Sequence, residues 1–316
     1  MPNGLLLIDK PVGLRSTECV ARVKRVFDKT TRVGHAGTLD STASGLLIVL
    51  LGAATRLSDY AMKLPKNYEA AVKLGVSTDT CDASGRVVFC GDASKVDERA
   101  FDRALCSFWG TRMQLPPEIS ALKVNGKPSH KIAREGQISK LISRPVAVTS
   151  VVRRSPLVND RVRISVTCGK GTYIRAIVRD IGKILGCGAH VEELRRLSIG
   201  PFLSLDACAM ENIDMKNIDP RHIRSPREIG APFHRVVLTD EAERRLSSGL
   251  SVPAAEAGRY LPGTLELRHG LCVQGKKMMG FADISGMTDN SGTVLKPRTN
   301  VADILDVNGG MDWGAA

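Results

Sequence analysis

The pattern of apolar and polar positions along this 316-residue chain predicts a sheet built from strands of two kinds. Residues 4–10 and 45–51 are apolar runs of strand length, and the second run has no polar position at all. Residues 68–74 and 161–168 alternate instead, as strands with one buried face do. Because several strands are half-buried, a wholly covered parallel sheet is disfavoured. The predicted fold class is α+β with a mixed or antiparallel sheet.

Apolar residues at helical spacing predict two helices in the same part of the chain. The first is expected to begin at Ser16 as its N-cap, with Val20, Val23 and Phe27 on one face and basic residues on the other. The second follows the glycine turn 169–172. Its expected buried stripe comprises Ile174, Ile177, Val178, Ile181, Ile184 and Leu185.

A change of pattern divides the chain into two predicted domains. From 203 to 233 the apolar periodicity weakens and three prolines appear, which is typical of a connector. We therefore expect one domain over residues 1–234 and a second over 235–305. The second begins with a helix near 240–248 and continues in short, glycine-separated segments, which predict a small β-rich barrel. Residues 306–316 are expected to form a loose tail.

Charge points to a polyanionic partner. The formal net charge is +12, and residues 235–316 contain 9 basic and 10 acidic residues, so the excess positive charge belongs to residues 1–234. Such a balance favours nucleic acid over an anionic membrane surface. Residues 116–150 hold six basic and two acidic residues. This segment is either a solvated surface excursion or an insertion that grips RNA.

The cysteines and histidines predict neither disulfides nor a metal site. Eight cysteines are scattered without a C-x-x-C pair, and the six histidines include no H-x-x-x-H spacing. This is the pattern of free thiols in a reducing compartment, so a cytoplasmic protein without metal is expected. No apolar run approaches the roughly 18 residues of a membrane span. No aromatic-rich patch is discernible, and a monomer is the expected state.

Candidate chemistry lies in the glycine-punctuated loop 34–40, which ends in Asp40 directly before the apolar run. A carboxylate placed at the edge of a rigid core can have its pKa and its direction tuned by its neighbours. An aspartate followed by serine and threonine is also common as a turn or helix-cap residue, and the loop alone leaves that alternative open. The glycine spacing does not fit G-x-G-x-x-G, and no P-loop lysine follows, so nucleotide binding is discounted.

An ordered series of motifs resembles the TruB family of tRNA pseudouridine synthases, from Gly4 to about Pro201. The series comprises Leu7-Ile8-Asp9-Lys10-Pro11, Gly34-His35-Ala36-Gly37-Thr38-Leu39-Asp40, Ala43-Ser44-Gly45, Asn67-Tyr68, Thr78-Asp79-Thr80-Cys81-Asp82-Ala83-Ser84-Gly85, Ser120-Ala121-Leu122-Lys123, Asn125-Gly126-Lys127, Lys170-Gly171-Thr172-Tyr173-Ile174-Arg175, and Gly188-Ala189-His190 to Leu194-Arg195-Arg196. The resemblance implies isomerisation of uridine to pseudouridine in the T-arm loop of tRNA, at position 55, by base flipping and without a cofactor.

The resemblance also implies roles for individual residues. Asp40 is the implied nucleophile, and Arg175 is its implied counter-charge. Tyr68 is expected to lie over the target base and, as a hypothesis, to remove the C5 proton. The implied substrate contacts are Tyr68, His35, Tyr173 and Leu194. Expected RNA contacts, with the insertion 116–150 gripping the T-arm, are Lys10, Lys123, Lys127, Lys131 and Arg134.

The C-terminal unit and three positions of the larger domain match the family pattern less completely. The C-terminal unit resembles a PUA domain, an RNA-binding pseudo-barrel. Ser41 and Thr42 stand where the family generally has Pro-Leu, and His130 stands where tyrosine is common. Loss of the proline is expected to loosen the loop that carries Asp40 without abolishing activity. Two alternatives remain open: a pseudouridylase of this family acting on another RNA, and a non-catalytic RNA-folding module.

Overall fold

The computed structural model describes residues 3–27, 29–119, 123–124, 127–128, 141–213, 218, 222–286 and 293–302. Up to residue 199 the elements are β1 (Gly4–Lys10), α1 (Ser16–Val26), β2 (Val33–His35), β3 (Ala43–Leu51), η1 (Gly52–Leu57), α2 (Ser58–Lys63), β4 (Lys66–Leu74), β5 (Val76–Thr78), β6 (Val87–Cys90), α3 (Glu98–Cys106), β7 (Gly110–Gln114), β8 (Lys123–Val124), β9 (Lys127–Pro128), β10 (Arg144–Arg153), β11 (Arg161–Cys168), α5 (Ile174–Ile184) and β12 (Ala189–Ile199).

The rest of the chain forms a second sheet and the segment leading to it. Its elements are β13 (Phe202–Leu203), η2 (Ser204–Asp206), β14 (Cys208–Ala209), η3 (Met210–Asn212), β15 (Ile223–Arg224), α6 (Arg227–Gly230), β16 (His234–Leu238), α7 (Asp240–Ser247), β17 (Val252–Pro253), α8 (Ala254–Ala257), β18 (Gly258–Leu261), η5 (Leu267–His269), β19 (Leu271–Gln274), β20 (Met278–Gly286) and β21 (Thr293–Ala302).

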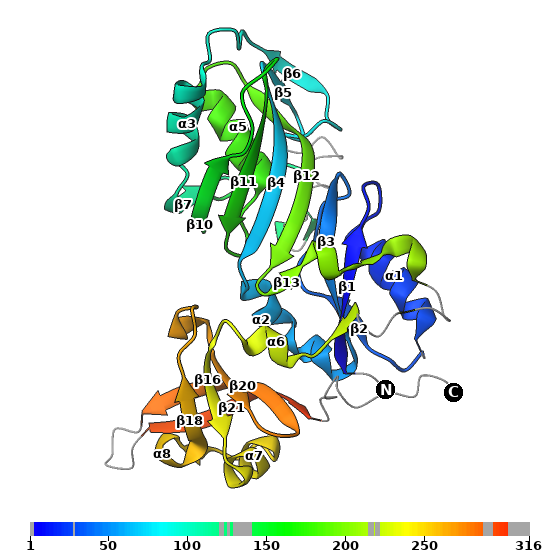
Figure 1. Cartoon of the computed structure of the whole chain (residues 1–316), viewed down its shortest axis with the longest axis vertical. Helices are drawn as coiled ribbons and strands as arrows, with labels where there is room; N and C mark the ends of the chain where they lie inside the picture. The colour runs from blue at the N-terminus through cyan, green and yellow to red at the C-terminus, as the bar shows by residue number, and fades with distance from the viewer. Residues whose placement is uncertain are drawn as a thin grey trace.

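A long mixed sheet forms the larger part of the molecule, with strand order β14-β1-β3-β12-β4-β11-β10-β7 (Figure 1). Strand β1 runs parallel to β14, and β12 runs parallel to β3, whereas the other neighbours in this order are antiparallel. The predicted α+β class with a mixed sheet is therefore confirmed. The strands predicted at 4–10 and 161–168 have the bounds of β1 and β11, whereas β3 and β4 each begin two residues earlier than predicted.

Packing on both faces explains the continuous apolar runs of β1 and β3. One face packs against α1 through a cluster that includes Leu6, Ile8 and Val23. The other face belongs to a second cluster with α2 and the C-terminal unit, and contains Leu5 and Leu46. Strands β4, β11 and β12 are covered by α3 and α5, which lie together on the same face of the sheet in Figure 1.

An aromatic cluster joins the two parts of the chain. The rings of Tyr60 on α2 and Phe281 on β20 stack with centroids 3.5 Å apart, and Phe233 meets both edge-on. The six-stranded C-terminal sheet has the order β17-β21-β20-β19-β16-β18, and α7 and α8 lie beside it (Figure 1). The two sheets therefore share one hydrophobic cluster instead of being separated by a flexible linker.

Several predictions from the pattern are wrong in detail. The N-cap of α1 is Arg15, and Ser16 is the first residue of the helix. Ile184, the last residue of α5, is 56% exposed and does not belong to the buried stripe of the helix. Two short strands of the predicted connector 203–233, β14 and β15, pair with β1. The last part of the segment expected as an insertion over 116–150 is strand β10, which pairs with β7 and β11 from Arg144 onward.

Candidate active site

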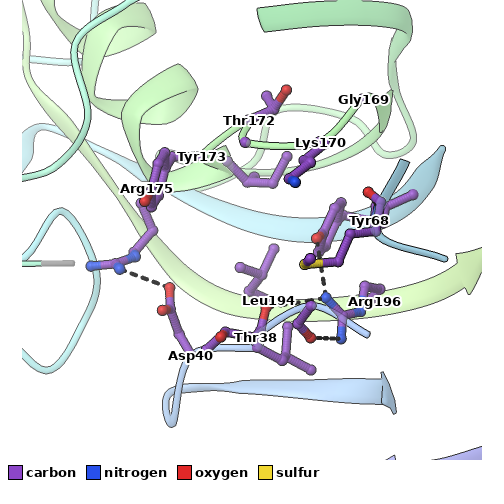
Figure 2. A pocket seen from close by; sticks show the side chains of 16 residues that line it. Thr38, Asp40, Tyr68, Gly169, Lys170, Thr172, Tyr173, Arg175, Leu194 and Arg196 are labelled. Atoms are coloured by element: carbon purple, nitrogen blue, oxygen red, sulfur yellow. Dashed lines mark hydrogen bonds and ion pairs between the residues drawn. The ribbon is translucent and has the colours of Figure 1, made fainter. Parts of the chain in front are cut away.

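A cavity of about 440 Å³ opens where β4, β12, the loop before β3 and the start of α5 meet (Figure 2). Its volume lies within the range of small-ligand sites. Its lining residues are Gly37, Thr38, Leu39, Asp40, Met62, Lys66, Tyr68, Gly169, Lys170, Gly171, Thr172, Tyr173, Ile174, Arg175, Leu194 and Arg196. Segments more than 150 residues apart in the sequence therefore contribute to one site.

The central interaction is an ion pair between Asp40 and Arg175. Arg175 Nη2 lies 2.7 Å from Asp40 Oδ2, and the arginine side chain is 6% exposed against 33% for the aspartate. Arg175 Nη1 also donates to the carbonyl oxygen of Thr80 at 2.8 Å. The arginine is thus held by two partners, while the second carboxylate oxygen of Asp40 has no ion-pair partner among the described residues (Figure 2).

The start of α5 is held by Gln114, a buried residue at the end of β7 that the sequence analysis did not single out. Its side-chain oxygen accepts a hydrogen bond from Tyr173 N at 2.9 Å, and its Nε2 donates to Tyr173 O at 3.1 Å. Tyr173 is the N-cap of α5, and Arg175 follows in the first turn. Gln114 therefore sets the position from which Arg175 reaches Asp40.

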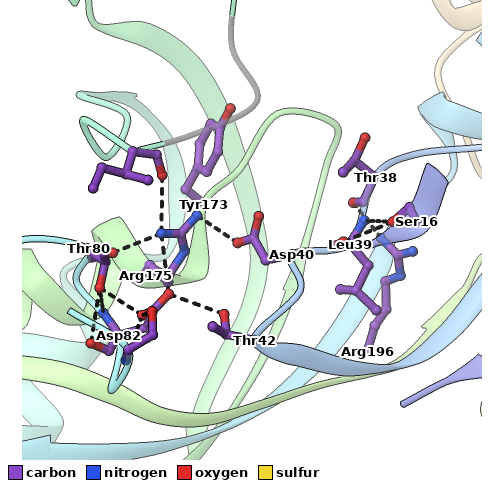
Figure 3. A network of polar contacts seen from close by, with 12 residues as sticks. Ser16, Thr38, Leu39, Asp40, Thr42, Thr80, Asp82, Tyr173, Arg175 and Arg196 are labelled. Atoms are coloured by element: carbon purple, nitrogen blue, oxygen red, sulfur yellow. Dashed lines mark hydrogen bonds and ion pairs between the residues drawn. The ribbon is translucent and has the colours of Figure 1, made fainter. Parts of the chain in front are cut away.

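A second carboxylate, that of the buried Asp82, lies on the other side of Arg175 (Figure 3). Its Oδ2 is 3.5 Å from Arg175 Nη1, and its Oδ1 accepts from Thr80 Oγ1 at 2.7 Å and from Ser84 Oγ at 2.5 Å. Burial alone would raise the pKa of Asp82. Hydrogen bonds from Ser84 and Thr80 and the charge of Arg175 outweigh burial and lower this pKa below its ordinary value. The arginine thus lies between two carboxylates.

Contacts at both ends fix the loop that carries Asp40. Ser16 Oγ donates to Leu39 O and accepts from Leu39 N, both at 2.9 Å, which replaces the capping role expected for this serine. Thr42 Oγ1 donates to Asp82 Oδ2 at 3.2 Å (Figure 3). Gly45 has a φ of +104°, and a Cβ at this position would collide with the backbone of β12. The loop is therefore anchored without a proline at position 41.

Tyr68 lies in the cavity opposite the ion pair, directly across from Arg196 in the β4–β12 register (Figure 2). Burial raises the pKa of the Tyr68 phenol, and the positive charge of Arg196 partly opposes that rise. Two residues earlier on the same strand, Lys66 donates to the carbonyl oxygens of Met62 and Leu64. Burial, assisted by the charge of Arg196, lowers the pKa of Lys66 to about 7.

Five of the six side chains expected at the site line this one cavity: Asp40, Tyr68, Tyr173, Arg175 and Leu194. His35 does not line it. Its ring is half-buried on β2, and burial together with the charge of Arg196 lowers its pKa. The Nδ1 atom of His35 is buried and lacks a hydrogen-bond partner within the described part of the chain.

The expected RNA contact at Lys10 is wrong. Its side chain is fully buried, and Nζ donates to Pro11 O at 2.7 Å and to Leu14 O at 2.8 Å. This lysine ties the end of β1 to the following turn, so phosphate cannot reach it. Lys123 and Lys127 lie on the short paired strands β8 and β9. Three further positions fall outside the described residues: Lys131, Arg134 and His130.

The described ranges contain no group of three or more His, Cys, Asp or Glu side chains placed to hold a metal ion. All eight cysteines are free thiols. No helix in these ranges is long and apolar enough to cross a membrane.

Comparison with known proteins yields one family. The family model described as the N-terminal domain of TruB family pseudouridylate synthases matches residues 24–174, and that of the tRNA pseudouridylate synthase B C-terminal domain matches residues 175–224. The tRNA pseudouridine synthase B of Ruegeria pomeroyi is 37% identical over 84% of this chain and 86% of its own length. That of Burkholderia mallei is 43% identical over 70% of this chain and 72% of its own.

Solved structures share the fold. A chain of a Cbf5-Nop10-Gar1 complex superimposes with a TM-score of 0.71 at 24% identity, over 94% of this chain and 84% of that one. A chain of an archaeal box H/ACA Nop10-Cbf5 complex gives a TM-score of 0.67 at 22% identity, over 94% and 85% of the two chains. With the family models and relatives matching over most of its length, this chain belongs to the TruB family of pseudouridylate synthases.

Proposed function

We propose that the protein isomerises uridine to pseudouridine in tRNA, at position 55 of the T-arm loop, with Asp40 as the catalytic nucleophile and without a cofactor. The observation that carries the proposal is the Asp40 carboxylate, held at 2.7 Å by a buried guanidinium at the rim of a cavity that also contains the Tyr68 ring. Family membership and the names of the relatives, tRNA pseudouridine synthase B, support tRNA as the substrate.

The reaction conserves every atom of the nucleotide. The bond between C1′ and N1 breaks, a bond between C1′ and C5 forms, C5 loses its proton, and N1 ends with one. Asp40 acts as the nucleophile, on either the sugar carbon or the ring, so that one difficult step is divided into two easier ones. The ion pair with Arg175 keeps the carboxylate directed into the cavity.

The target uridine must leave its stack before Asp40 can reach it, at a cost of a few kcal/mol. The Tyr68 ring offers the flipped base a stacking surface, an interaction worth about 1–3 kcal/mol per base. In this proposal its hydroxyl also takes the proton from C5. Tyr173 and Leu194 complete the walls around the base.

The wider surface is proposed to bind the T-arm. The net charge of +12, concentrated in residues 1–234, predicts salt-dependent binding, and the basic segment 116–150 is the proposed grip. The C-terminal sheet with α7 and α8 is proposed to be a PUA-like unit over residues 235–305. Its near-neutral charge assigns it an architectural role more than a phosphate-binding one. A monomer in the cytoplasm, where the free cysteines stay reduced, completes the proposal.

Incubation of the purified chain with an unmodified tRNA transcript tests this proposal. Pseudouridine is mapped by carbodiimide treatment and reverse transcription for wild type, Asp40→Asn and Asp180→Asn. Asp180 is a suitable control because it is also paired with an arginine and is 29% exposed, close to the 33% of Asp40, but it does not line the cavity.

We expect product at the T-loop uridine with wild type and Asp180→Asn, without added guide RNA, and none with Asp40→Asn. Tight binding without product from wild type would instead identify a non-catalytic RNA-folding module. Product at another uridine only, or only with a guide RNA, would identify a pseudouridylase with a different RNA target.

A further inference from the structure

Arg196 is a fully buried guanidinium without a carboxylate partner among the described residues. Its side chain is 1% exposed, and Nε donates to Leu46 O at 2.7 Å. Nη1 and Nη2 approach Thr38 O and Gly37 O, each at 3.3 Å, and Nη1 also lies 3.5 Å from the Tyr68 hydroxyl oxygen. Burying an unpaired charge is costly, and proteins retain one mainly where it serves a site.

The acceptors of Arg196 belong to three different elements around the cavity. Leu46 lies on β3, Gly37 and Thr38 lie on the loop that leads to Asp40, and Tyr68 lies on β4. The planar fork of an arginine can satisfy several acceptors at fixed angles, which a lysine cannot do. One side chain therefore fixes both the loop of the nucleophile and the ring opposite to it (Figure 2).

The charged groups around Tyr68 affect how readily its phenol loses a proton. Burial raises the pKa of the phenol, and the negative charge of Asp40, from its loop, acts in the same direction. Arg196, from β12, acts in the opposite direction, and its Nη1 lies within hydrogen-bond range of the hydroxyl. The other ionisable groups that line the cavity are Lys66, Lys170, Tyr173 and Arg175.

We propose that Arg196 is a positioning residue for the isomerisation: it holds the Tyr68 hydroxyl in place relative to the Asp40 loop and keeps a fixed positive charge against the phenolic oxygen. This inference rests on the proposed function. When C5 loses its proton, the electron pair of the C5–H bond forms the C5–C6 double bond, and N1 ends with a proton. The phenolic oxygen that accepts the C5 proton does so in its deprotonated form, which a neighbouring cation stabilises.

Single-turnover rates on T-arm RNA carrying hydrogen or deuterium at the target C5 test the inference. The variants are Arg196→Gln, which removes the charge, and Arg196→Lys, which keeps a charge but cannot bridge the same acceptors. Arg195→Gln is the matched control, since Arg195 is the neighbouring arginine on β12, pairs with Asp9 at 2.8 Å and does not line the cavity. RNA affinity and urea unfolding are measured for each variant.

For Arg196→Gln we expect the rate to fall about 100-fold, the lower end of what a positioned general base contributes, with RNA affinity within about threefold of wild type. The C5-deuterium isotope effect should rise well above that of wild type, because proton removal becomes the slow step. Arg196→Lys should lose about tenfold and show an intermediate isotope effect. Arg195→Gln should match wild type in both.

A folded Arg196→Gln variant with the wild-type rate would overturn the inference. So would a slower variant whose isotope effect does not rise, which is the signature of a merely structural arginine. If Arg196→Gln does not fold, Arg196→Lys decides by the same two criteria. Failure of the proposed function is distinct, because it appears as wild-type protein that makes no pseudouridine in the T-arm RNA.

Discussion

Replacing Arg175 by methionine is the most informative perturbation of this site. Methionine approximates the length of the arginine stem but removes its charge and its donors. The Asp40 carboxylate then loses a partner at 2.7 Å, and Asp82, whose side chain is 7% exposed, loses the nearby charge at 3.5 Å. We expect a loss of both stability and catalysis, for separable reasons.

The expected loss of stability in Arg175→Met follows from the distances between the charged groups. Two unit charges about 3.5 Å apart attract by roughly 5 kcal/mol at an effective dielectric constant of about 20, before desolvation is subtracted. Removing one partner of a buried pair typically costs about 3–5 kcal/mol. Because the Asp40 side chain is 33% exposed, water replaces part of what it loses. The remaining hydrogen bonds of Asp82 to Thr80 and Ser84 also offset part of its loss, so we expect a destabilisation of about 3 kcal/mol.

A double-mutant cycle in urea measures this directly. The proteins are wild type, Arg175→Met, Asp82→Asn and the double variant. Since the asparagine removes the charge that the missing arginine leaves unpaired, the double variant should be more stable than the two single losses added together, by about 1–2 kcal/mol. Arg179→Met is the matched control, because Arg179 lies one turn later on α5 and pairs with Asp180 outside the cavity.

Catalysis provides the second readout. The single-turnover rate of Arg175→Met should fall by at least about 100-fold, because Asp40 loses the contact that directs it, whereas Arg179→Met should stay within about threefold of wild type. A coupling energy below about 0.5 kcal/mol between positions 175 and 82 would refute the electrostatic reasoning. A wild-type rate for Arg175→Met would refute the positioning role.

Three further predictions concern single side chains around the cavity. Because the pKa of Asp82 is lowered in the folded state, its contribution to stability is present above its unfolded pKa of about 3.9 and is lost as the pH falls through the folded pKa. In urea unfolding, the difference between wild type and Asp82→Asn should therefore shrink as the pH falls below that unfolded pKa. The pKa of Lys66 is lowered to about 7, so the unfolded chain binds more protons than the folded one between about pH 7 and 10. The free energy of unfolding should therefore rise over this range, by up to about 1.4 kcal/mol per pH unit, and Lys66→Met should lack this rise. If the variant and wild type show the same dependence on pH, the burial of a lysine that titrates near neutrality is contradicted. Thr42→Val removes the hydrogen bond to Asp82, so it should lower the free energy of unfolding by about 1 kcal/mol. The single-turnover rate should fall by less than about tenfold, because Ser16 still holds the loop. A complete loss of turnover would show that the hydrogen bonds of Ser16 to Leu39 do not suffice to hold the loop.

Local patterns in the sequence determined much of the fold. The alternation over 161–168 and the apolar run before Gly52 predicted β11 and β3, because burial of one or both faces of a strand leaves a trace in adjacent residues. The motif series placed five side chains that the structure brings to one cavity, from Asp40 to Leu194. The motif series could identify these side chains together because its members come from several elements of one site. Hydrophobic periodicity, in contrast, predicts one helix or strand at a time.

Only the tertiary structure decided what the polar side chains do. Lys10 resembled a surface cation, yet it is fully buried and bonded to two carbonyl oxygens. Gln114 and Asp82 act on residues 59 and 93 positions away in the chain, and Arg196 reaches acceptors up to 159 positions away. A strand or a helix is specified by neighbours a few positions apart, and sequence shows those directly. The role of a buried polar group depends instead on which distant partners the fold brings within hydrogen-bond range, and the chain must be folded before those partners exist.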